Sequence, residues 1–168
     1  MKVAILLENL FDEREFIYPY YRLQEAGYEV LAVAPEVGTY RGKSGLEMRA
    51  DAAVSSVSPE DFVGLVIPGG YAPDRLRRYP EVLEFVRGMN DSGKPIAAIC
   101  HAGWVLISAG VVRGRRMTGF FAIKDDLINA GAHYVDEPVV VDGNLITSRH
   151  PGDLKVWMKE YLKHLPRP

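Results

Sequence analysis

One cysteine in this chain stands where an enzyme could hold a nucleophile. Cys100 ends the apolar run at residues 95–100 and is followed by His101 and the small pair Ala102-Gly103. This order predicts a strand that turns sharply into a helix, with the cysteine at the turn, as in a nucleophile elbow. The free amides and the dipole of a helix start favour an anion, so we expect a lowered thiol pKa and a reactive thiolate. A buried structural cysteine is the alternative interpretation of this segment.

Other residues have types and positions that would complete such a site. Gly70 ends a neighbouring strand, and its backbone amide, together with that of His101, would form an oxyanion hole. The His101 imidazole would act as a general base if a carboxylate orients it, and Asp74 is a candidate for that role or else a helix cap. Glu15 lies one turn into the first helix and would hydrogen-bond the Cys100 sulfur, unless it is a surface acid.

Motifs for cofactors and metals fail on their spacing. The segment at residues 38–44 has three residues between its glycines, where a phosphate-binding loop requires four. No dinucleotide fingerprint follows the first strand. The four histidines lack metal-ligand spacing, and one cysteine cannot build a cysteine-based zinc site or an intrachain disulfide. We therefore expect no cofactor and no metal.

The elements that must position these residues alternate between strand and helix. Continuous apolar runs predict core strands at residues 2–8, 28–34, 63–67 and 95–100. Helical periodicity and stop signals predict helices at residues 13–26, 80–91, 101–109, 122–130 and 153–165. An antiparallel excursion is expected within residues 38–53, and a hairpin at residues 139–146 around Asp142-Gly143. This alternation predicts an α/β fold, a mainly parallel sheet with helices on both faces and sites at the carboxyl ends of its strands.

Composition limits the class of protein. The chain has 168 residues, 48% hydrophobic and 25% charged, with a net charge of −2, which fits one soluble domain over residues 1–168. This charge balance gives no footprint for nucleic acid, and no apolar run is long enough for a membrane span. We expect a cytoplasmic protein. Asparagine occurs four times and glutamine once, a weak thermophile signal.

Five segments together resemble the PfpI-type intracellular proteases of the ThiJ/PfpI superfamily, over essentially the whole chain. They are residues 15–20 (EFIYPY), 66–70 (VIPGG), 98–101 (AICH), 123–131 (IKDDLINAG) and 147–151 (TSRHP). The resemblance implies a single PfpI-like (class I glutamine amidotransferase-like) domain, built as a three-layer flavodoxin-like sandwich.

The same resemblance implies roles for the candidate residues. It implies Cys100 as nucleophile, His101 as its base and a carboxylate at position 74 supplied by an adjacent subunit. Glu15 matches the acid beside the cysteine. Sites of this kind form at subunit interfaces, so a dimer-based homo-oligomer, up to a hexamer, is expected.

The sequence departs from this family pattern near the expected site. Asp74 stands where the archaeal proteases usually carry Glu, and its shorter side chain could leave the contact with His101 too long. Phe120 replaces a Tyr of close relatives, and Tyr71 replaces an Arg. Trp104 follows the cysteine segment and would either narrow the pocket or lie in the core.

Three functions use the same cysteine. The leading prediction is an intracellular cysteine peptidase that cleaves small peptides through Cys100 and His101. The first alternative is a deglycase or glyoxalase, in which Cys100 forms a hemithioacetal with methylglyoxal or its protein adducts and Glu15 moves protons. The second alternative is a redox sensor or chaperone whose cysteine oxidises to a sulfinic acid. No nucleic acid or membrane partner is expected.

Overall fold

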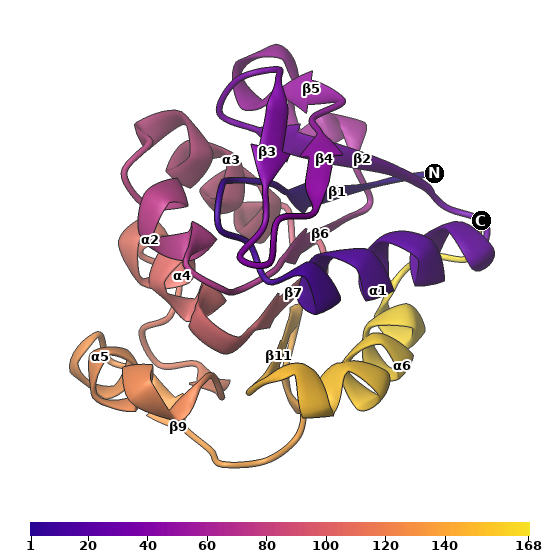
Figure 1. Cartoon of the computed structure of the whole chain (residues 1–168). Helices are drawn as coiled ribbons and strands as arrows, with labels where there is room; N and C mark the ends of the chain where they lie inside the picture. Colours follow the sequence, from indigo (N-terminus) through magenta and orange to yellow (C-terminus); the bar gives the residue numbers. More distant parts are fainter.

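A computed structural model describes all 168 residues, and its centre is a seven-stranded sheet (Figure 1). The order across the sheet is β10-β11-β7-β6-β1-β2-β5, and every neighbouring pair is parallel except β10 and β11. The strands are β1 (Lys2–Leu6), β2 (Glu29–Ala34), β5 (Ala52–Ala53), β6 (Gly64–Ile67), β7 (Ile96–Ile99), β10 (Val140–Asp142) and β11 (Leu145–Ser148).

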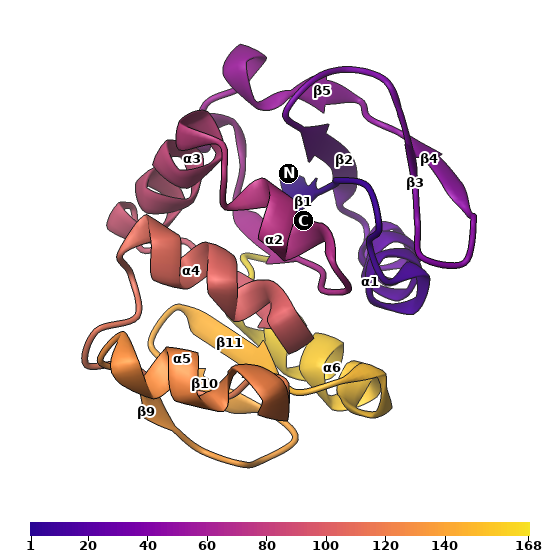
Figure 2. The same cartoon turned by 60° about the vertical axis from the view of Figure 1, so that its left-hand side comes forward.

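Helices cover both faces of this sheet (Figures 1 and 2). On one face lie α1 (Glu13–Glu25) and α6 (Leu154–His164), which contact each other. On the other face lie α3 (Pro80–Asp91) and α4 (Gly103–Ala109), together with α2 (Ala72–Leu76) and α5 (Lys124–Asn129). The predicted α/β sandwich with a mainly parallel sheet is confirmed, and its five main parallel strands follow the flavodoxin-like order.

The apolar strand β1 shows why the sheet needs both helix layers. Successive side chains of a strand point to opposite faces. Ala4 and Leu6 therefore pack in the core beneath α3 and α4, while Val3 and Ile5 pack in the core beneath α1 and α6. All four are buried. A strand with no polar face is stable only where helices cover both sides.

The helix α1 is positioned by its cap and its apolar stripe. The Asp12 side chain accepts hydrogen bonds from the backbone amides of Arg14 and Glu15, which fixes the start of the helix. Phe16 and Leu23 then bury one face against the sheet. Because the cap lies directly after β1, the first turn of α1 stands above the carboxyl end of that strand.

Most predicted elements match the structure to within a few residues. The excursion is an antiparallel pair, β3 (Thr39–Arg41) with β4 (Glu47–Arg49), and the predicted hairpin is β10–β11. The predicted helix at 101–109 begins as a 3₁₀ turn and becomes α-helical only at Gly103. Short 3₁₀ turns also occur at Val54–Ser56, Pro59–Asp61, Phe121–Ile123 and Pro151–Asp153.

The sequence did not predict three features. They are α2, the two-residue strand β5 that joins the main sheet in parallel with β2, and a two-residue parallel pair, β8 (Arg116–Met117) with β9 (His133–Tyr134). No helix has the length and apolar character to cross a bilayer.

The order of the strands creates a topological switch point. After β1 the chain adds β2 on one side of it, and then adds β6 and β7 on the other side. The carboxyl ends of β1, β6 and β7 therefore meet where the order of the strands reverses.

Candidate active site

Cys100 stands at the sharp turn that its sequence predicts. Ile99 ends β7 in an extended conformation, and Cys100 itself has a φ of 61°, in the left-handed region. This conformation costs a non-glycine residue roughly 1–2 kcal/mol, so the surrounding structure must hold it in place. The Cys100 carbonyl accepts a hydrogen bond of 3.0 Å from the Phe120 amide. The thiol is buried to 8% exposure but borders a cavity of about 390 Å³.

The glycine pair after β6 lets two loops approach the cysteine. A Cβ on Gly69 would lie 2.5 Å from Glu15 Oε1 and 2.8 Å from Cys100 Cβ, so no larger residue fits. Gly70 has a φ of 85° and pairs with Phe11 in an isolated antiparallel bridge. The backbone amides of Gly70 and His101 interact with the Cys100 sulfur and favour its thiolate. The structure thus brings together the two donors predicted for an oxyanion hole.

Glu15 is a fully buried acid beside this cysteine, not a surface residue. Its Oε1 accepts a hydrogen bond of 2.8 Å from the Gly69 amide, and its Oε2 is buried without a partner. Burial, reinforced by the nearby Asp12 carboxylate, raises the pKa of Glu15 to about 8. The carboxyl group is therefore mostly protonated at pH 7.

The predicted lowering of the thiol pKa is wrong for this chain. Burial, and after it repulsion from the Glu15 carboxylate once that group has ionised, outweigh the backbone amides of His101 and Gly70 and raise the pKa of Cys100 to about 12. Desolvation disfavours the charged form of a buried group, and when two acids are adjacent, ionisation of one disfavours ionisation of the other. Cys100 is thus a thiol at rest, and its proton must leave as the sulfur reacts.

His101 is placed to accept that proton. Its Nδ1 lies 3.1 Å from the Cys100 sulfur. The ring stacks on Phe120, with centroids 5.0 Å apart, and meets Trp104 edge-on at 5.1 Å. Burial, and to a smaller extent the Lys43 charge, lower the pKa of His101, so the imidazole is neutral at pH 7 and can act as a base.

Asp74 does not reach His101 within one chain. Its carboxylate binds Arg78, just after the end of α2, at 2.7 Å, its side chain is half-exposed, and it does not line the Cys100 cavity. Only a second copy of the chain could bring an Asp74 to this histidine.

The sequence reasoning missed three charged residues that line the cavity. Asp12 is almost fully buried and forms ion pairs with Arg14 at 2.9 Å and Lys43 at 3.1 Å. Lys43 lies in the segment rejected as a phosphate loop, and Asp12 shows the helix-cap pattern. Each of these patterns is common in sequences, and nothing in the sequence indicates that the three side chains meet at the Cys100 cavity.

Two of the four departures from the family pattern lie on the cavity wall, and Asp74 and Trp104 do not. Tyr71 and Phe120 line the cavity, and Tyr71 is 63% exposed. Trp104 lies partly buried at the edge of the core, and its indole donates a hydrogen bond of 2.9 Å to Asp126. It touches the cavity only through its contact with the His101 ring. Nowhere in the chain do three or more metal-binding side chains gather.

Comparison with known proteins identifies relatives along the whole chain. A model of the DJ-1/PfpI family matches residues 1–164. Deglycase PfpI from Pyrococcus furiosus is 48% identical over 165 residues, which cover 98% of this chain and 99% of that protein. YraA from Bacillus subtilis, whose name assigns it provisionally to the cysteine proteases, is 42% identical over 165 residues, 98% of each chain.

A solved structure shares both fold and sequence. It is a two-domain protein from Anabaena variabilis with a DJ-1/ThiJ/PfpI-like and a ferritin-like domain. The TM-score is 0.95 at 46% identity, over 96% of this chain. The chain spans 47% of that two-domain protein.

Proposed function

Because the chain belongs to the DJ-1/PfpI family, we propose that it is a cysteine-dependent enzyme that acts on the carbonyl group of methylglyoxal or of its adducts with protein side chains. The resemblance inferred from the sequence is confirmed. The names of the relatives include both deglycase and cysteine protease, so they do not rank carbonyl chemistry against peptide hydrolysis. We place carbonyl chemistry first because of Glu15.

The protonated, buried carboxyl group of Glu15 is the observation that carries this proposal. Its pKa of about 8 lies close to neutral pH, where a group can both donate and accept a proton. A peptidase of the Cys-His type has no need of such an acid. An enzyme that moves a proton between two carbon atoms needs one acid–base group beside its nucleophile.

In the first step the Cys100 sulfur adds to the aldehyde carbon of methylglyoxal. The S–C bond forms and the carbonyl π bond breaks. The thiol proton passes to His101 Nδ1, which is 3.1 Å away, and Glu15 gives its proton to the carbonyl oxygen. The product is a hemithioacetal, with the amides of Gly70 and His101 available to the developing negative charge.

In the second step the Glu15 carboxylate removes the proton from the hemithioacetal carbon and returns it to the neighbouring ketone carbon. The first carbon is oxidised to a thioester and the second is reduced to an alcohol, because the ketone oxygen takes a proton from the His101 imidazolium and the hemithioacetal hydroxyl gives its proton back to the neutral imidazole. No external oxidant or reductant is required. Water then adds to the thioester: its hydroxyl bonds to the acyl carbon and its proton goes to the Glu15 carboxylate. The S–C bond breaks, the imidazolium returns a proton to the sulfur, and lactic acid leaves as lactate and a proton.

Adducts of methylglyoxal with amines follow the same reaction steps once the addition of the amine has been reversed. When the C–N bond between methylglyoxal and an amine breaks, the aldehyde carbonyl reforms and the proton returns to the amine. The charged side chains of Arg14 and Lys43 at the cavity are placed to bind the carboxylate product.

Peptide hydrolysis remains the second candidate, favoured by the 3.1 Å contact between Cys100 and His101. That function requires a carboxylate to orient the imidazole. The chain supplies none to His101 by itself, so the acid would be Asp74 of a neighbouring copy in the proposed homo-oligomer.

Two variants separate the candidates when methylglyoxal consumption and cleavage of a fluorogenic peptide are measured side by side. Glu15→Gln should reduce kcat/KM for methylglyoxal by about 10²–10⁴. Asp74→Asn should leave methylglyoxal turnover unchanged and abolish any peptide cleavage. Glu25→Gln, a 77%-exposed acid at the other end of α1, serves as the matched control and should behave as wild type.

The opposite pattern would contradict our preference for carbonyl chemistry over peptide hydrolysis. If Glu15→Gln turns over methylglyoxal at the wild-type rate while Asp74→Asn loses peptide cleavage, the chain is a peptidase and Glu15 is structural.

A further inference from the structure

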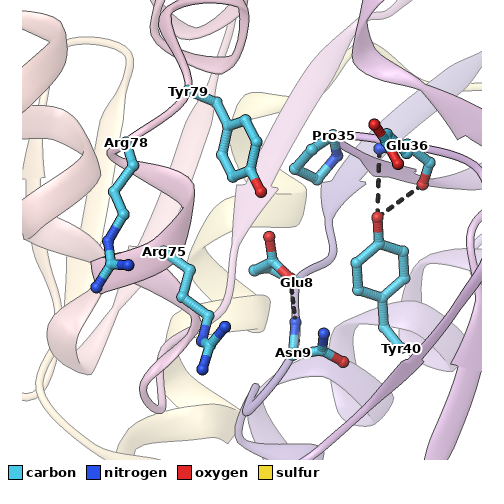
Figure 3. A pocket seen from close by; sticks show the side chains of 8 residues that line it. All are labelled: Glu8, Asn9, Pro35, Glu36, Tyr40, Arg75, Arg78 and Tyr79. Atoms are coloured by element: carbon cyan, nitrogen blue, oxygen red, sulfur yellow. Dashed lines mark hydrogen bonds between the residues drawn. The ribbon is translucent and has the colours of Figure 1, made fainter.

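A second cavity, of about 260 Å³, opens where β1 and β2 end (Figure 3). It shares no lining residue with the Cys100 cavity. We call it the Glu8 cavity, after the acid at its centre. The polar residues of its wall are Glu8, Asn9, Glu36, Tyr40, Arg75, Arg78 and Tyr79.

Glu8 is the most unusual group in this wall. Its residue is only 4% exposed, and its Oε1 accepts a hydrogen bond of 2.7 Å from the Asn9 amide. The second carboxylate oxygen has no hydrogen-bond partner in the chain and borders the cavity. This oxygen is open to the cavity, where it can accept a hydrogen bond from a bound donor or pair with a cation.

Arg75 provides the opposite charge on the same wall. Its guanidinium forms no ion pair and no hydrogen bond, in contrast to Arg78, which is bound to Asp74 at 2.7 Å. Arg75 and Glu8 do not pair with each other. The exposed Glu36 and the Asp74-bound Arg78 also line the cavity, so its wall carries two acids and two arginines, and Arg75 is the arginine without an ion pair.

Two tyrosines complete the polar surface in different ways. The Tyr40 hydroxyl is already engaged, because it donates to the Glu36 carbonyl at 2.7 Å and accepts from the Glu36 amide at 3.2 Å. The Tyr79 hydroxyl has no hydrogen bond within the chain, and Figure 3 shows it turned toward the Glu8 carboxyl. Among the charged and hydroxyl groups, the free donors are therefore Arg75 and Tyr79, and the free acceptors are the second oxygen of Glu8 and the exposed Glu36 carboxylate.

We propose that the Glu8 cavity binds a small zwitterion, an α-amino acid, with its ammonium on Glu8 and its carboxylate on Arg75. A simple anion would meet the carboxylates of Glu8 and Glu36, and a simple cation would leave Arg75 unused. The volume of about 260 Å³ accommodates a free amino acid. Binding here does not depend on the function proposed for Cys100.

The position of the cavity adds a reason for interest. Glu8 and Asn9 line it, and Asp12 and Glu15, four and seven residues after Glu8, border the Cys100 cavity. One short segment after β1 thus contributes to both sites.

The test uses L-serine and two fragments of it. The fragments are 3-hydroxypropanoate, which lacks the ammonium, and ethanolamine, which lacks the carboxylate. Each is titrated into the ¹⁵N-labelled full chain while amide chemical shifts are recorded. L-serine should give saturable shifts centred on Glu8, Asn9 and Tyr79, with a dissociation constant in about the millimolar range. Each fragment should bind at least about tenfold more weakly.

Variants connect the binding to the two charges. Glu8→Gln keeps the acceptor for the Asn9 amide but removes the negative charge. Arg75→Gln removes the positive charge of an exposed side chain, so the fold should stay intact. Each should weaken L-serine binding by about tenfold. Arg116→Gln, which removes the same charge on the exposed β8, is the control and should bind as wild type.

Several outcomes would overturn the proposal. They are no saturable shift up to about 50 mM L-serine, shifts centred outside the cavity, a fragment that binds as well as L-serine, or an Arg75→Gln variant that binds as wild type.

Discussion

Replacing Glu15 by glutamine tests the electrostatics of the site without changing its shape. Glutamine keeps the volume of the side chain and the acceptor for the Gly69 amide, which lies 2.8 Å from Glu15 Oε1. It removes only the ability to ionise. The pKa of Glu15 is about 8 in the folded chain against an ordinary value of 4.5, with burial as the main cause.

The sign of the effect follows from proton binding. Between pH 4.5 and pH 8 the folded chain keeps a proton on Glu15 that the unfolded chain has released. The free energy of unfolding therefore falls as the pH rises through this window. One pKa unit corresponds to about 1.4 kcal/mol, so this single group removes about 3–4 kcal/mol between pH 5 and pH 8.

The glutamine variant lacks this penalty. The difference in free energy of unfolding, variant minus wild type, should therefore increase by about 3–4 kcal/mol from pH 5 to pH 8. Urea denaturation at several pH values measures the difference, and the exposed Glu25→Gln variant should show none. Parallel pH profiles for wild type and Glu15→Gln would refute the assignment of a neutral Glu15.

Two further predictions concern the geometry around the cysteine. Gly69→Ala should destabilise the fold by about 1–3 kcal/mol and lower turnover, because a Cβ there would lie 2.5 Å from Glu15 Oε1 and 2.8 Å from Cys100 Cβ; a thermal unfolding midpoint equal to wild type would contradict the close approach of the three residues. Phe120→Ala should expose the ring of His101 and raise its pKa toward 6.5, because burial is the main cause of the lowered value. Titration of the histidine ring signals by NMR measures this shift, and an unchanged pKa would show that Phe120 does not shield the ring.

The sequence predicts those parts of the fold that rest on local patterns. The apolar run that becomes β1 requires burial on both faces, and the Asp142-Gly143 pair specifies a tight hairpin. The strand that ends at Cys100 has the pattern of an elbow, and the positive φ agrees with it. Each of these features can be read within about ten residues of chain.

Features that depend on distant contacts could not be predicted. The thiol pKa is raised first by the burial of Cys100 itself and then by Glu15, which lies 85 positions earlier in the chain. Lys43 reaches the cavity from the β3–β4 connection, where its own sequence resembles a failed phosphate loop. The short helix α2 has too few residues to show a period, and its Asp74 turns to Arg78.

The most direct test of the account is the formation of lactate from methylglyoxal by wild type and by Cys100→Ser. Serine keeps the size and the position of the nucleophile but is far less reactive at neutral pH. We expect lactate from the wild-type chain and a loss of at least about a thousandfold in the variant, with the fold intact by circular dichroism. Lactate formation that persists in Cys100→Ser would contradict the central claim that the sulfur of Cys100 attacks the carbonyl carbon.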